Sequence, residues 1–106
     1  MDPKAAIVAE IVKLVTATRT KIEPHYKMSP ELHGVEPSLS LLDLILREEL
    51  VDGKPTNPNR FYGRLSSASD CLTMALRHRD FTRMEEYVSK DVYRACGLAQ
   101  SLQYLP

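Results

Sequence analysis

The sequence predicts an all-α protein, a small bundle of four main helices that ends in an antiparallel helical hairpin. Two long segments with apolar residues at helical spacing flank a short joint at Asp80-Phe81. Thr82 is followed three residues later by Glu85, a pair that can satisfy two unpaired backbone amides at the start of a helix. The joint therefore predicts a new helix, and so short a connection folds the two helices back on each other.

The first helix is predicted to begin at Pro3, where Asp2 can cap it, and to end before Pro24. Its apolar stripe consists of Ile7, Ile11, Leu14, Thr18 and Ile22, and it is widened by Val8, Val12 and Val15. A stripe this wide is typical of a helix that packs against two neighbours. The stretch 24–37 is irregular, with a single helical turn predicted at 30–34.

The second helix is predicted from residue 37 or 38 to residue 51, because Gly53 is a natural stop. Five of the six residues at 41–46 are apolar, so this helix is apolar around most of its circumference. A chain of 106 residues has little material to bury such a helix on all sides. Part of this surface is therefore expected to meet another protein or a second copy of the chain, and a purely central role in the monomer stays open.

The last two helices form the predicted hairpin. The third begins near Pro58, with Thr56 or Asn57 as its cap, and small residues at 63–67 make a weak point within it. Its predicted seam, with spacings of four and three residues as in a coiled coil, consists of Phe61, Leu65, Ala68, Leu72, Ala75 and Arg79. The fourth covers 83–104, and its apolar face consists of Met84, Val88, Val92, Ala95, Ala99 and Leu102.

Composition indicates a single domain over residues 1–106, with no formal net charge to attract nucleic acid or membranes. Residues 29–59 hold six acidic and two basic residues, between two mildly basic ends, a pattern that favours complementarity within the protein or within a dimer. Neither a secretory signal nor a membrane-spanning run is visible, and Cys71 and Cys96 are too few for a disulfide framework, so we expect a cytoplasmic protein.

Catalytic and metal-binding signatures are missing from the sequence, so neither enzymatic activity nor a cofactor is expected. His25 and His33 lie eight residues apart across a proline, and both cysteines are distant in sequence, which argues against a metal site. The function class that remains is a small regulatory or adaptor protein, of the antiactivator or inhibitor type, which binds and occludes another protein. In this hypothesis Leu41, Leu44, Ile45 and Leu50 fill a groove on the target or form a homodimer, and Glu48, Glu49 and Asp52 provide an acidic rim.

The alternative function is association with nucleic acid. Arg77, Arg79 and Arg83 surround the predicted hairpin turn and form the densest basic group in the chain. A salt-sensitive phosphate contact at this tip would make the protein a nucleic-acid-associated helical protein.

Overall fold

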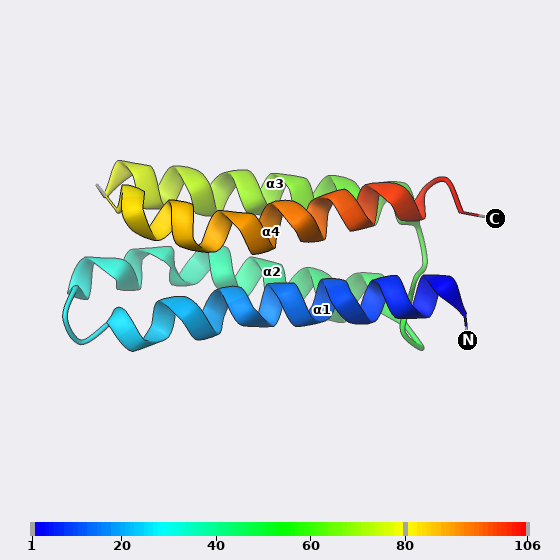
Figure 1. Ribbon diagram of the computed structural model, residues 1–106, viewed down its shortest axis with the longest axis horizontal. Helices are drawn as coiled ribbons and strands as arrows, with labels where there is room; N and C mark the ends of the chain where they lie inside the picture. Colours follow the sequence, from blue (N-terminus) through cyan, green and yellow to red (C-terminus); the bar gives the residue numbers. More distant parts are fainter. Residues whose placement is uncertain (1, 80, 106) are drawn as a thin grey trace.

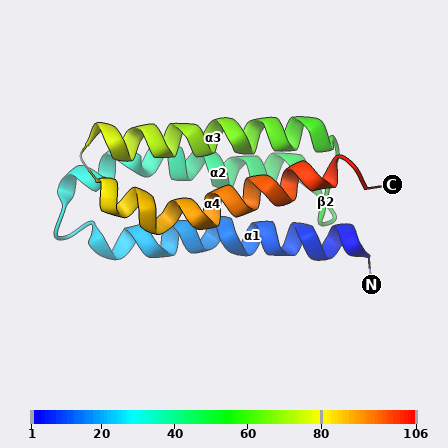
Figure 2. The ribbon, with the colours of Figure 1, turned by 45° about the horizontal axis from the view of Figure 1, so that its top comes forward.

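Four helices that run side by side make up the computed structural model, which describes residues 2–79 and 81–105 (Figure 1). The helices are α1 (Pro3–Ile22), α2 (Glu36–Glu49), α3 (Pro58–His78) and α4 (Thr82–Leu102). Helix α1 packs most extensively on α4, α4 packs on α3, and α3 packs on α2 (Figure 2). The molecule measures 45 × 21 × 20 Å, and the predicted all-α bundle with a C-terminal hairpin is confirmed.

Helix α1 begins and ends where the sequence predicts. The Asp2 carboxylate accepts a hydrogen bond from the Lys4 amide at 2.9 Å, and Pro3 occupies the first helical position. After Ile22 the chain passes into a short 3-10 helix, η1 (Glu23–His25), that contains Pro24. The buried residues of α1 are Val8, Ile11, Leu14, Val15, Thr18 and Ile22. Val12, which was expected to widen this stripe, is 36% exposed. It directly follows the buried Ile11, and one residue along an α-helix turns the side chain by about 100° around the axis, away from the core.

The chain enters and leaves α2 differently from the prediction. A second 3-10 helix, η2 (Pro30–Val35), continues past Gly34 directly into α2. At the other end, α2 stops at Glu49, and β1 (Leu50–Val51) pairs antiparallel with β2 (Lys54–Pro55). Asp52 and Gly53 both have positive φ, 53° and 75°, as a two-residue hairpin turn requires. The predicted loop is therefore a small β-hairpin.

Helix α3 confirms one of the two predicted caps. Asn57 accepts a hydrogen bond from the Arg60 amide at 3.1 Å, and the helix continues without a break through the predicted weak point at 63–67. The buried seam follows the expected residues as far as Leu72 and then passes to Leu76 instead of Ala75 and Arg79. The shift arises because a helix has 3.6 residues per turn, so a straight helix departs from a strict seven-residue repeat.

The hairpin between α3 and α4 is tight, and the Phe81 amide donates to the Leu76 carbonyl at 2.9 Å. Asp80, the first residue of the predicted joint, lies outside the residues that the structure describes. The predicted pairing of Thr82 with Glu85 is wrong, because Phe81 is the cap residue and Thr82 is already helical. The Glu85 carboxylate instead accepts hydrogen bonds from Arg77 on α3, so a contact between helices replaces a contact within the helix start.

Candidate functional site

The face that α2 turns toward the core differs from the face predicted to bind a partner. The buried residues of α2, which form the face toward the core, are Leu39, Leu42, Ile45 and Glu49. Leu41 is half-buried and Leu44 is 37% exposed, so both lie at the edge of the surface. Ile45 is only 1% exposed and belongs to the core of the bundle, which is a correction to its expected place on a binding surface.

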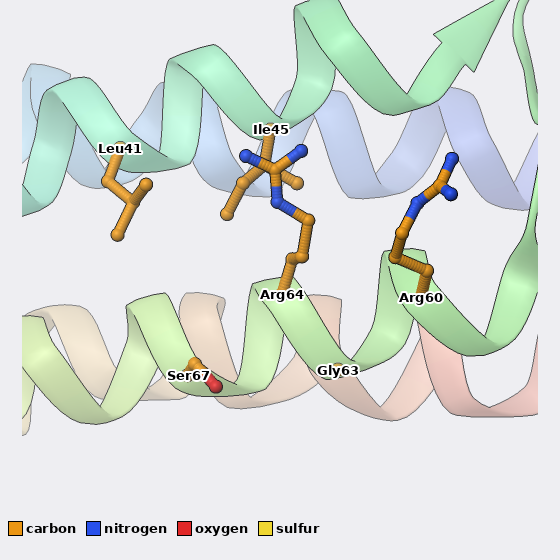
Figure 3. Close-up of a pocket in the computed structure, with 6 residues that line it drawn as sticks. All are labelled: Leu41, Ile45, Arg60, Gly63, Arg64 and Ser67. Atoms are coloured by element: carbon orange, nitrogen blue, oxygen red, sulfur yellow. The ribbon is translucent and has the colours of Figure 1, made fainter.

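An open hollow of about 360 Å³ lies between α2 and α3 (Figure 3). Figure 3 shows Leu41 and Ile45 pointing from α2 toward α3, and Arg60 and Arg64 reaching from α3 toward α2. The remaining lining residues, Gly63 and Ser67, are small. Apart from Gly63, its two chain neighbours and the adjacent backbone of α3, no described atom lies within 4 Å of where a Cβ on Gly63 would stand. The missing side chain at this position therefore keeps the hollow open.

Two residues that line the hollow, Arg60 and Arg64, belong to an ion-pair network. The carboxylate of Glu49 is nearly buried and pairs with Arg60 and with Arg64, each at 2.8 Å. Arg64 also pairs with Glu48 at 2.8 Å. Hydrogen bonds from Arg60 and then from Arg64 hold the pKa of Glu49 below its usual range.

The predicted acidic rim of Glu48, Glu49 and Asp52 differs from the structure, because two of its carboxylates are paired with arginines. Two arginines of α3 neutralise Glu48 and Glu49, so only Asp52 of the three carboxylates has no ion pair within the described chain. Leu50 lies in β1 and packs partly buried against the core. The sequence contained a signal for Glu49, because it follows Ile45 by four residues and therefore lies on the same helical stripe.

Met74 is a residue of this side that the sequence interpretation missed. It follows Ser67 by seven residues, which is two helical turns, and it is 65% exposed. Leu41 lines the hollow, and Leu44 and Met74 are exposed apolar residues of the same two helices. We call these three residues, together with the hollow, the α2–α3 surface.

The three arginines predicted to form a cationic tip do not act as one group. Arg77 pairs with Glu85 at 2.8 Å, which neutralises it and raises its pKa. The Arg79 guanidinium packs over Gly34 and leaves no room for a Cβ there, and it donates a hydrogen bond to a backbone carbonyl of α3. Only Arg83, on α4, is both exposed and without an ion pair to the residues that the structure describes.

Metal and cysteine chemistry have little support in the described residues. Within residues 2–79 and 81–105, no three His, Cys, Asp or Glu side chains are placed to hold a metal ion. His33 instead stacks against Tyr26, with ring centroids 4.5 Å apart. Cys71 is exposed, Cys96 is half-buried, and both are free thiols. Of the described helices, none combines the length and the apolar character needed to cross a membrane.

Comparison of the chain with protein-family models, with curated protein sequences and with solved structures gave no match in any of the three. With no relative to compare, a function for this chain has to be inferred from its own residues, and the α2–α3 surface offers the best-defined group of them.

Proposed function

We propose that this protein is a small non-enzymatic regulator, of the antiactivator or inhibitor type, that binds another protein at its α2–α3 surface. The observation that supports the proposal is the hollow beside Gly63, whose exposed lining is mostly apolar. A concave site with an apolar lining and a few charged groups beside it is the usual form of a binding site.

The shape of the surface favours a helix as the bound element. Leu41 and Ile45 of α2 and Gly63 and Ser67 of α3 line the hollow from its two sides, so it lies between two neighbouring helices. An amphipathic helix places apolar side chains at the matching spacing of three and four residues, and one large side chain would enter the space beside Gly63. The bound helix would then be hidden from its own target, which is the occluding mechanism.

The first test is a pull-down from nuclease-treated native lysate, read by mass spectrometry, with two matched variants. Leu44→Glu places a charge on the α2–α3 surface, whereas Val12→Glu places one at an equally exposed apolar position on α1. We expect a protein that wild type and Val12→Glu capture in stoichiometric amounts and that Leu44→Glu loses. If every protein captured by wild type is captured equally by folded Leu44→Glu, the proposal is wrong.

A second pair of variants tests the hollow itself. Gly63 and Gly97 are both helical glycines, and beyond the adjacent chain of their own helices no described atom lies within 4 Å of an added Cβ. Gly63→Gln fills the hollow, while Gly97→Gln adds the same side chain to α4. Loss of capture by the first variant alone supports the proposal, and equal capture by both contradicts it.

A second copy of the chain is the competing occupant, since a homodimer could use the same residues. Sedimentation equilibrium of the purified protein separates the two cases. A monomer that still captures a partner supports regulation of another protein. A dimer that Leu44→Glu dissociates, with no partner captured, would assign the surface to self-association and overturn the regulator proposal. The proposal places the protein in the cytoplasm, which its two free thiols support.

A further inference from the structure

Three cationic side chains without an ion-pair partner among the described residues lie close together on the outer side of α4. Most arginines of the other helices are held by carboxylates: Arg19, Arg60, Arg64 and Arg77 each make at least one ion pair. Arg83, Lys90 and Arg94 are exposed and make no ion pair with any residue that the structure describes. Their spacing of seven and four residues places them on one stripe of the helix, about 16 Å long.

An exposed aromatic ring lies within this stripe. Tyr87 is four residues after Arg83 and three before Lys90, and it is 55% exposed. The Lys21 ammonium of α1 lies 4.9 Å from the centre of the ring, and the same ammonium pairs with Asp91. Lys21 therefore covers one face of the ring and fixes its position, which leaves the other face for a planar ligand.

A hollow of about 410 Å³ adjoins the ring, and it is lined by His25, Arg83, Met84 and Tyr87. It lies where the end of α1 meets the start of α4. The backbone amides at the beginning of α4 carry the positive end of that helix dipole, which adds to the attraction for an anion here. Apolar walls, a ring edge and a guanidinium thus converge on one space.

We propose that this stripe of Arg83, Tyr87, Lys90 and Arg94 binds single-stranded nucleic acid. Stacked aromatic side chains and a line of cations are the two elements by which proteins hold single strands without reading their sequence. A base would stack on the free face of Tyr87, and the phosphates would follow the three cations along α4. A duplex offers no unstacked base, so it would bind more weakly.

The nearby carboxylates do not cancel the stripe. Asp91 is occupied by Lys21, and Glu86 is a single exposed carboxylate beside three cations. The stripe lies on α4, where Lys21 of α1 contacts Tyr87, whereas the α2–α3 surface belongs to the other two helices of the bundle (Figure 2). Variants of one surface therefore leave the other intact, and failure of either proposal does not decide the other.

The test is fluorescence anisotropy of a labelled oligothymidylate titrated with the intact protein. Three phosphate contacts on a single strand predict a slope of about −2 in log K against log salt, or roughly 20-fold weaker binding between about 50 and about 200 mM salt. We expect Lys90→Glu with Arg94→Glu to weaken binding by at least tenfold, roughly the effect of two lost phosphate contacts. The control, Lys4→Glu with Arg47→Glu, makes the same change in net charge elsewhere and is expected to stay within about threefold of wild type, because salt screens distant charges.

The ring has its own test. Tyr87→Ala is expected to weaken oligothymidylate binding by about fivefold or more, while Tyr87→Phe keeps it, because stacking needs the ring and not the hydroxyl. Inorganic polyphosphate, which has no bases, is expected to bind wild type and Tyr87→Ala equally. The proposal is overturned if wild type fails to bind oligothymidylate at low salt, if both charge-reversal pairs weaken binding equally, or if Tyr87→Ala binds like wild type.

Discussion

Adjacent residues of α2 give the sharpest test of how this helix is oriented. Ile45 is 1% exposed and Leu44 is 37% exposed, although both are aliphatic and lose the same three carbons on replacement by alanine. Transfer of three buried carbons from the core to water is worth about 2.4 kcal/mol, and the cavity left in the core raises the cost of Ile45→Ala to about 3–4 kcal/mol. Leu44→Ala leaves no closed cavity and removes carbons that are already partly hydrated, so its cost is about 1.5 kcal/mol.

The measurement is urea and thermal denaturation of both variants and wild type, followed by circular dichroism at the helical band. A difference of about 2 kcal/mol between the variants corresponds to about 8 °C in Tm for a domain of this size. Each experiment is run at two protein concentrations, because a dimer that buries Leu44 would make the Leu44→Ala deficit depend on concentration. Equal losses for the two variants at both concentrations would refute the orientation of α2 described above.

Three further predictions concern single residues, and each is checked by unfolding measurements on the purified variant. Glu49→Gln is expected to lower the free energy of unfolding at neutral pH and to make that free energy depend less on pH in acid. The two arginine partners lower the folded-state pKa of Glu49, so wild type loses this stabilisation as the pH falls through that pKa. Equal pH profiles for the variant and wild type would contradict the prediction. Gly53→Ala costs about 1 kcal/mol, because Gly53 has a φ of 75°; an unchanged Tm would argue against the turn. Gly63→Ala and Gly97→Ala each stabilise the helix they lie in by about 0.5–1 kcal/mol, and a loss at Gly63 would mean that the hollow is closed.

Local chemistry explains which parts of the fold could be predicted from the sequence. Asp2 and Asn57 cap their helices with their own side chains, and prolines stand at the first helical positions after them. These are contacts within a few residues, so the sequence reveals them directly. The Asp52-Gly53 hairpin is of the same kind, because this dipeptide is a strong signal for a two-residue turn. It was missed because the flanking strands are only two residues each.

Contacts between helices account for what could not be predicted. The position of Glu85 suits a residue that caps α4, but its carboxylate accepts hydrogen bonds from Arg77, which lies eight residues earlier on α3. Glu49 lies on the buried stripe of α2, but its ion-pair partners, Arg60 and Arg64, lie on α3 and could not be predicted from the pattern of α2 alone. For the candidate site, the sequence predicted Leu41 and Leu44 but gave no sign that Gly63 of the next helix lines a hollow together with Leu41. A pattern along one helix reports its own faces and cannot report which side chain lies opposite.

The packing of α1 against α4 has a consequence for synthesis of the chain. Lys21 and Asp91 are 70 residues apart, yet they join the two helices that pack most extensively on each other. On the ribosome α1 emerges well before α4, so its apolar stripe lacks the helix on which it packs most extensively while the intervening residues are made. The α2–α3 unit, linked by a short hairpin, can form in the meantime from nearby contacts. The newly made chain therefore exposes the α1 stripe until α4 arrives, and this interval is when chaperones or aggregation would act on it.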